Sequence, residues 1–342
     1  MIKRSHIFDK IISLENLFFA WREFKRGKLK KPGVQEFNFN LENNLFALRD
    51  DLKNKAYQPD KYVFFYVRDP KLRPIHKATV KDRVVFQAVF RILYQIFDRK
   101  LIYDTYSCRF GKGTHSGVRR LEDFLRKASG NYHRSVFALK CDVRQFFYSI
   151  DHGILKNLIQ KEISDEDALD LISKIIDSFC TRQGLGLPLG NVTSQLFANI
   201  YLNELDQYVK HILKEKYYLR YCDDFIIASL DRKYLTDLVP KIETFLRDRL
   251  RLALHPRKVE IRKILQGVDF LGYVVLPYYR VLRTKTKRRI FSKIDKKAAE
   301  CKGGLLDKHS LKQSVQSYLG VLKHCKGYNL GEKMMKIVES IK

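Results

Sequence analysis

The feature that most constrains this 342-residue chain is a pair of adjacent aspartates between two short apolar runs. Asp223 and Asp224 separate residues 217–222 from residues 225–228. Two such runs with a sharp polar break predict an antiparallel hairpin that carries two carboxylates at its turn. Aspartate is also common in turns without chemistry, because it tolerates the dihedral angles that turns require. The hairpin alone therefore leaves both a structural turn and a functional site open.

A third carboxylate ends another apolar run, because Asp142 directly follows residues 136–141. If that strand pairs with the hairpin, three carboxylates converge and repel one another unless cations bind between them. Carboxylate oxygens suit Mg²⁺, with Mn²⁺ as an alternative, and two such ions suit an in-line displacement at phosphorus. Asp142, Asp223 and Asp224 are therefore candidate catalytic residues and candidate ligands of two Mg²⁺ ions, and a purely structural turn stays open at this point.

The order of the expected elements predicts a mixed α+β fold. Strands and helices do not alternate regularly, as a doubly wound parallel sheet would require. Helices are expected over residues 9–28, 80–100, 194–213 and 235–251, and strands over 62–67, 72–78, 136–141, 217–222, 225–228, 259–264 and 268–276.

Positive charge is concentrated in the C-terminal quarter. The chain has 66 Lys and Arg against 38 Asp and Glu, a net charge of +28, and residues 251–342 hold 22 of these cations and only 7 of the acids. A folded protein with this excess most often binds a polyanion, and so few acids cannot pair with all these cations along helices. We expect a surface that follows nucleic-acid phosphates. The candidate residues are Arg283, Lys285, Lys287, Arg288 and Arg289. Lys112, in an upstream glycine-rich loop, is a further candidate, and a loop residue that contacts only water is an equal alternative.

The distribution of apolar residues and cysteines argues against a membrane-embedded or secreted protein. No apolar run approaches the roughly 18 residues of a membrane helix, and the N-terminus lacks the apolar core of a secretory signal. The six cysteines form no CxxC pair. We expect a cytoplasmic protein with reduced thiols and no membrane partner.

Five segments, in this order along the chain, resemble the motifs of reverse transcriptases. They are residues 69–83, the Asp142 strand, residues 186–194, the Tyr221-Cys222-Asp223-Asp224 hairpin and residues 270–273. The resemblance covers residues 15–326 and implies a right-hand polymerase fold with fingers, a palm built on an antiparallel sheet and a helical thumb. The division it implies is an N-terminal helical extension (1–60), fingers (61–135), palm (136–276, with fingers elements at about 151–183) and a basic helical thumb (277–342).

The resemblance also implies roles for individual side chains. Lys71 and Arg73 would bind the triphosphate of the incoming nucleotide, where cationic donors match phosphate oxygens. The alternative for both residues is a basic surface turn that contacts no nucleotide. Phe147 would pack under the sugar and exclude a 2′-hydroxyl. The alternative is that its ring belongs to the hydrophobic core and contacts no nucleotide. Gly190 would let the backbone approach the substrate base pair. The primer grip would consist of Phe270, Leu271, Gly272 and Tyr273.

Two nucleotide-site positions depart from the usual pattern of the family. Leu189 stands where most members have Gln, and Gln195 stands where most have Pro. Leu189 cannot hydrogen-bond near the nascent base pair, so discrimination against mismatched incoming nucleotides should weaken. This pattern resembles the reverse transcriptases of diversity-generating retroelements, which copy a template RNA with errors at adenines. Reverse transcriptases of bacterial antiviral-defence systems, which work with a non-coding RNA, share related features and are the alternative.

We therefore expect an RNA-directed DNA polymerase that makes cDNA from a dedicated RNA template with low fidelity, in a diversity-generating retroelement. The expected partners are the template RNA, the RNA/DNA duplex, dNTPs, a structured non-coding RNA and an accessory protein subunit, since no segment is left for an RNase H, maturase or endonuclease domain. A catalytically silent RNA-binding scaffold is a minor alternative, disfavoured by the complete carboxylate set. Phe147 argues against a ribonucleotide polymerase.

Overall fold

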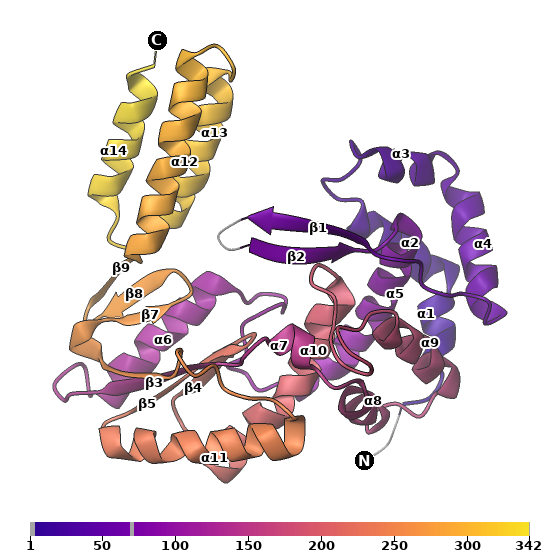
Figure 1. Cartoon of the computed structure of the whole chain (residues 1–342), viewed down its shortest axis with the longest axis horizontal. Coiled ribbons are helices and arrows are strands. Elements are labelled where there is room, and N and C mark those ends of the chain that lie inside the picture. The colour runs from indigo at the N-terminus through magenta and orange to yellow at the C-terminus, as the bar shows by residue number, and fades with distance from the viewer. Residues whose placement is uncertain (1–3, 69–71, 342) are drawn as a thin grey trace.

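The computed structural model describes residues 4–68 and 72–341. Its helices and antiparallel sheets form a fingers-like region of N-terminal helices, a central four-stranded sheet and a C-terminal bundle of helices (Figure 1). Among the described residues, no helix is both long enough and apolar enough to span a membrane.

The four-stranded sheet brings the expected strands together in the order β4-β5-β3-β6, with each pair antiparallel. Its strands are β3 (Phe137–Asp142), β4 (Tyr218–Tyr221), β5 (Asp224–Ser229) and β6 (Glu260–Lys263). The expected pairing of the Asp142 strand with the hairpin is confirmed, because β3 lies directly beside β5.

Strand β3 separates two hydrophobic cores, because successive side chains of a strand point to opposite faces. Leu139 belongs to the core under the fingers, and Ala138 belongs to the core that continues into the C-terminal helices. Helix α11 (Arg232–Leu250) packs on the first face and α6 (Thr114–Ala128) on the second, so the sheet is covered on both sides (Figure 1).

A separate hairpin consists of β1 (Val63–Arg68) and β2 (Leu72–Lys77), in the region predicted to be the fingers. The helix expected over 80–100 is α5 (Val80–Phe97) followed by the short 3₁₀ helix η1 (Asp98–Lys100). Thr79 caps α5, because its hydroxyl accepts a hydrogen bond from the Asp82 amide at 3.2 Å. Figure 1 shows the β1–β2 hairpin extending from the fingers toward the C-terminal bundle.

The single helix expected over 9–28 is wrong. The segment forms two helices, α1 (Phe8–Ile12) and α2 (Leu14–Phe24), with a break at Ser13. The Ser13 hydroxyl accepts a hydrogen bond from the Asn16 amide, so serine caps a new helix instead of continuing the old one. Other helices of this half are α3 (Pro32–Phe39), α4 (Leu41–Lys53), α7 (Phe146–Ser149), α8 (His152–Gln160) and α9 (Glu166–Asp177).

The helix expected over 194–213 begins earlier and changes type. It is α10 (Val192–Gln207), which continues as the π-helical segment η2 (Tyr208–Ile212).

The C-terminal part begins with a three-stranded sheet of β7 (Val268–Phe270), β8 (Tyr273–Leu276) and β9 (Tyr279–Leu282). The single strand expected over 268–276 is wrong, because a turn with positive φ at Leu271 and Gly272 divides it into β7 and β8. Strand β9 lies in a segment that was expected to be helical. The short 3₁₀ helix η3 (Ile264–Gln266) precedes this sheet, and three helices follow it: α12 (Thr284–Lys302), α13 (Lys308–Leu322) and α14 (Tyr328–Glu339). The proposed division into extension, fingers, palm and thumb stays a prediction.

Candidate active site

The three aspartates lie at one end of the four-stranded sheet. Asp142, the last residue of β3, is paired in register with Asp224, the first residue of β5. Asp223 stands in the turn beside them, where its carbonyl accepts a hydrogen bond from the Val143 amide at 3.2 Å. The antiparallel register therefore places a carboxylate on each of two neighbouring strands and a third on the connecting turn.

The turn itself differs slightly from the expected one. Tyr221 pairs with Asp224, so the two-residue loop consists of Cys222 and Asp223, and Asp224 already belongs to the strand. Cys222 has φ of +56°, a conformation that residues with a β-carbon adopt rarely and that surrounding structure must enforce.

The carboxylates of the turn are hard to ionise together. Burial raises the pKa of Asp224 to about 6, and the neighbouring Asp142 and Asp223 charges add to the effect. Burial and the Asp142 charge also raise the pKa of Asp223. Both pKa values are raised, as expected for buried carboxylates whose negative charges are not fully compensated by neighbouring cations.

Lys258 supplies a positive charge to this cluster, and sequence reasoning missed it. Its Nζ lies 2.6 Å from Oδ1 of Asp142. The lysine follows a turn in which the His255 amide donates to the Asp142 carbonyl at 2.8 Å. A signal was present, because Lys258 directly precedes the strand region that pairs with β3.

The donor chemistry of this sheet end fits a hard divalent cation. Within the part of the chain that the structure describes, however, no three His, Cys, Asp or Glu side chains are grouped closely enough to form a metal cage by themselves. Magnesium commonly binds through one or two carboxylates and completes its shell with water and substrate phosphates. The arrangement therefore suits metal that binds together with substrate.

A second missed residue, Arg220, lies directly under the turn. Its Nη1 donates to the Cys222 carbonyl at 2.9 Å and to Oδ1 of Asn199 at 3.2 Å. Its other guanidinium nitrogens bind Asp206, and both side chains are fully buried. A buried arginine just before an acidic turn was the available signal.

The loop before α10 lies against the fingers hairpin. The His76 amide of β2 donates to the Leu189 carbonyl at 3.3 Å. Gly190 has φ of +112°, and a β-carbon there would lie 3.3 Å from Cγ2 of Ile75. The positive φ favours glycine at this position, and a β-carbon would also press on the Ile75 methyl group.

The other expected nucleotide contacts surround this loop. Phe147 is half-buried on α7, and its carbonyl accepts a hydrogen bond from the Leu187 amide at 2.7 Å. Arg73 is exposed on β2 and close enough to affect the pKa of Tyr148, which burial raises and the Arg73 charge lowers. Lys71 lies outside the described residues.

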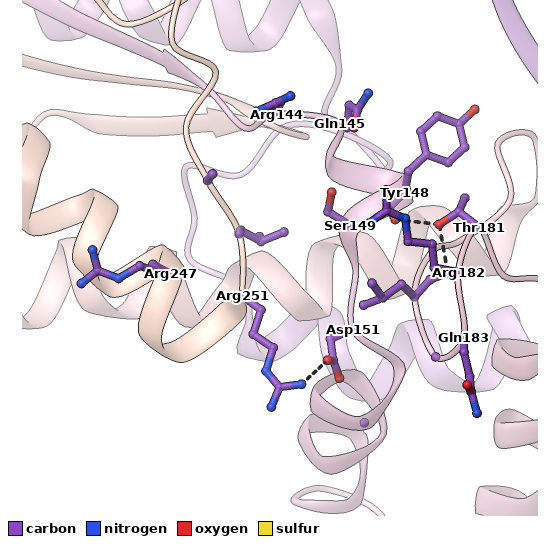
Figure 2. Close-up of a pocket in the computed structure, with 15 residues that line it drawn as sticks. Arg144, Gln145, Tyr148, Ser149, Asp151, Thr181, Arg182, Gln183, Arg247 and Arg251 are labelled. Carbon is purple, nitrogen blue, oxygen red and sulfur yellow. Dashed lines mark hydrogen bonds and ion pairs between the residues drawn. The ribbon is translucent and has the colours of Figure 1, made fainter.

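A wide cavity of about 1260 Å³ adjoins the segment that follows Asp142. Arg247 and Arg251 line it from the end of α11, and Arg182 lines it from another loop. In Figure 2 the Arg251 side chain points toward Asp151, whereas Arg247 points away from the other labelled residues. Arg144 completes a set of four arginines, against which the only lining carboxylate among the described residues is Asp151, 2.8 Å from Arg251. The lining charge is therefore strongly positive.

The expected primer-grip tetrapeptide forms the turn between β7 and β8. Phe270 pairs with Tyr273, and the loop residues Leu271 and Gly272 have φ of +50° and +91°, as two-residue hairpin turns often require. The Gly272 carbonyl accepts a hydrogen bond from the Arg283 amide at 2.9 Å, which ties the hairpin to the start of α12.

The expected phosphate-contact residues divide into two groups. Lys285, Lys287 and Arg288 are exposed on the first turns of α12, and Arg289 is half-buried. Arg283 forms an ion pair with Asp269. The Lys112 ammonium donates to the Tyr103 carbonyl and lies 3.6 Å from the centre of the Tyr103 ring. These last two side chains are already engaged within the protein.

Gln195 is exposed on α10 and lines a pocket with Phe110 and Tyr94.

Comparison with known proteins identifies the family. The family model described as "Reverse transcriptase (RNA-dependent DNA polymerase)" matches residues 66–275, which is more than half of the chain. The chain therefore belongs to the reverse transcriptase family, whose members are RNA-directed DNA polymerases.

Several curated proteins are similar to this chain. Protein YkfC of Escherichia coli K12 is 25% identical over 287 residues, covering 71% of this chain and 75% of that protein. The group II intron-encoded protein LtrA of Lactococcus lactis is 24% identical over 319 residues, covering 72% of this chain and 51% of that protein. Nuclear intron maturase 3 of Arabidopsis thaliana is 22% identical over 227 residues, covering 56% of this chain and 31% of that protein. The chain thus spans about half or less of these two intron-type relatives.

A solved structure supports the fold. The apo telomerase of Candida tropicalis, truncated from its C-terminal domain, superposes with a TM-score of 0.50 at 14% identity, covering 70% of this chain and 60% of that one. The expected right-hand polymerase architecture is confirmed at this level.

Proposed function

We propose that this chain copies an RNA template into DNA by nucleotidyl transfer at the Asp142, Asp223 and Asp224 end of the palm sheet. The observation that carries the proposal is the register of β3 and β5, which places Asp142 opposite Asp224 with Asp223 in the adjoining turn. The family membership supports RNA as template and dNTPs as substrates.

In this proposal the 3′-hydroxyl of the primer loses its proton to solvent and its oxygen bonds to the α-phosphorus, while the bond from that phosphorus to the pyrophosphate oxygen breaks and pyrophosphate leaves. Two Mg²⁺ ions, when bound, would activate that hydroxyl and stabilise the leaving oxygen. The three aspartates would hold the ions, with Mn²⁺ as a possible substitute. Arg73, Lys71 and the arginine-lined cavity offer donors for the phosphates, and Phe147 would limit the sugar to deoxyribose.

The exposed cations of α12 would follow the duplex backbone without reading its sequence. Lys285, Lys287 and Arg288 project from the bundle that lies opposite the fingers hairpin (Figure 1). Phe270, Leu271, Gly272 and Tyr273 would position the primer, because their hairpin is tied to the start of this helix.

We further propose that the polymerase is error-prone and serves a diversity-generating retroelement, with a dedicated template RNA, a structured non-coding RNA and an accessory subunit as partners. The apolar Leu189 in the loop that contacts β2 supports the low fidelity. A neighbouring gene with an imperfect repeat would support the biological role, whereas a lone non-coding RNA in a defence island would favour antiviral defence.

Primer extension on an RNA template with dNTPs and Mg²⁺ tests the activity. We expect extension by the wild type and its loss in Asp223→Asn, whereas Asp237→Asn on the exposed side of α11 serves as a matched control that extends normally. Equal extension by Asp223→Asn and the wild type would refute the assignment of the catalytic site.

A further inference from the structure

A pocket of about 470 Å³ lies outside the catalytic site, between α2, α5, the loop before α6 and the start of α10. Three aromatic side chains, Phe90, Tyr94 and Phe110, form one part of its lining. A cavity of this size is large enough for a nucleobase but small for a folded protein element.

The aromatic rings leave one face open. The ring centres of Phe90 and Tyr94 lie 5.3 Å apart, and those of Tyr94 and Phe110 lie 4.7 Å apart in an edge-to-face arrangement. Phe90 is only 8% exposed, whereas Phe110 is 73% exposed. Phe110 therefore packs against Tyr94 and presents most of its surface to solvent.

The backbone that carries Phe110 is fixed. Its own amide donates to the Tyr94 hydroxyl at 2.8 Å. The preceding Arg109 is held by Asp98 at 2.7 Å and by the carbonyls of Ile102 and Thr105 at 2.7 and 3.2 Å. An exposed aromatic ring on a rigid loop is preorganised for stacking, because little conformational freedom is lost on binding.

Polar and charged groups border the aromatic rings. Gln195, Gln87, Arg26 and Glu23 also line the pocket. The Gln87 amide donates to the Glu23 carboxylate at 2.7 Å, and Arg91 forms an ion pair with the same carboxylate, so these groups are engaged within the protein. Arg26 belongs to residues 22–31, which contain six Lys and Arg and a single acid, Glu23. Aromatic platforms with side-chain amides and a nearby basic segment are the combination by which proteins bind single-stranded RNA.

The position of the pocket indicates which strand it would meet. Gln195 lies three residues after α10 begins at Val192, and Leu189 and Gly190 directly precede that helix. The pocket is therefore within one helical turn of the loop proposed to line the nascent base pair.

We propose that this pocket binds an unpaired base of the template RNA just ahead of the base pair being formed, with Phe110 as the stacking platform and Gln195 contacting the base edge. The inference rests on the proposed polymerase function. The exposed Arg22, Arg26, Lys30 and Lys31 would contact phosphates of the same strand.

A fluorescent template tests the proposal. An RNA template–primer carries 2-aminopurine at the first, second or third unpaired template position, and its fluorescence is read with and without the wild-type protein. Stacking on an aromatic ring quenches this base, so we expect a loss of fluorescence at one position. No quenching at any of the three positions would overturn the proposal.

Substitutions at Phe110 make the test specific. Phe110→Leu keeps the apolar volume but removes the aromatic face, and it should abolish the quenching and weaken binding of the overhanging template–primer roughly tenfold. Phe110→Trp should retain both. Phe39→Ala, which removes a phenylalanine 87% exposed on α3, is the matched surface control. Thermal melting of each variant identifies misfolding, and the Trp variant still decides the question if the Leu variant melts early.

The outcomes also separate this proposal from the proposed function. Quenching at one position without primer extension by the wild type would refute the polymerase proposal and leave the base pocket standing. Extension with equal template affinity in Phe110→Leu and wild type would refute the pocket and leave the polymerase standing.

Discussion

Arg220 and Asp206 form an ion pair in which both side chains are fully buried, with Nη2 of Arg220 2.6 Å from Oδ2 of Asp206. The pair joins β4 to α10 directly beneath the turn that carries Asp223. Asp206 also accepts hydrogen bonds from the Tyr218 hydroxyl at 2.6 Å and the Thr105 hydroxyl at 3.2 Å. Since Arg220 donates to the Cys222 carbonyl, this network stabilises Cys222 in its conformation with positive φ.

Removing one partner of this pair should destabilise the protein strongly. We expect Arg220→Met to lower the free energy of unfolding by about 3–5 kcal/mol, because Asp206 remains as an uncompensated buried charge. The double variant Arg220→Met, Asp206→Leu should recover part of the loss, which urea unfolding measures. Equal stability of the single variant and the wild type would contradict the buried network.

The conservative variant Arg220→Lys separates positioning of the turn from stability. Lysine keeps the charge beside Asp206 but cannot bind both Asp206 and the Cys222 carbonyl with a planar fork. We expect a higher Mg²⁺ concentration for half-maximal primer extension while the melting temperature falls by only a few degrees. An unchanged Mg²⁺ requirement would limit Arg220 to a structural role.

Lys258 should compete with divalent cations for Asp142. The pair is partly exposed, with side chains 39% and 11% accessible, so the interaction is worth about 1 kcal/mol at most. We expect Lys258→Met to bind Mn²⁺ up to about fivefold more tightly in the absence of nucleic acid, measured by electron paramagnetic resonance. Lys263→Met serves as the control, and weaker Mn²⁺ binding by Lys258→Met would contradict the competition.

The sequence predicted the parts of this site that depend on local order and on strand periodicity. The positions of Asp142, Asp223 and Asp224 at strand ends follow from the apolar runs beside them. Local order marks the positions of Lys258 and Arg220 but does not predict their roles, because these come from contacts with residues 116 and 14 positions away. The break at Ser13 was missed because a capping serine and an internal serine look alike within an amphipathic run.

Phe147 should control the choice of sugar. Replacing the half-buried ring by alanine opens space for a 2′-hydroxyl, so we expect Phe147→Ala to raise the efficiency of rNTP incorporation relative to dNTPs by at least about tenfold. Single-nucleotide extension with each substrate measures the ratio. The same ratio in wild type and variant would remove Phe147 from the sugar site.

Leu189 should set the error rate. Leu189→Gln restores an amide that can hydrogen-bond near the base pair, and we expect misincorporation opposite template adenine to fall. Sequencing of cDNA made by both enzymes measures the error spectrum, with Leu305→Gln, at an 84% exposed position between α12 and α13, as the control. An unchanged spectrum would exclude Leu189 as a fidelity determinant.

The junction between the C-terminal helices and the sheet should weaken at mildly acidic pH. The rings of His115 on α6 and His324 after α13 stack with centres 3.8 Å apart. Burial lowers the pKa of His115, and the positive charges of His324, Arg119 and Arg280 lower it further. The Tyr273 hydroxyl lies 3.3 Å from Nδ1 of His115.

A histidine with a lowered pKa in the folded state takes up its proton more readily when unfolded. The unfolded chain therefore binds more protons as pH falls below about 6.5, and stability decreases in that range. We expect the melting temperature of the wild type to fall more between pH 7.5 and 5.5 than that of His115→Phe, which keeps a stacked ring but cannot titrate. His133→Phe, at an exposed position outside the junction, should follow the wild-type profile. Parallel profiles for wild type and His115→Phe would show that this histidine pair does not govern the junction.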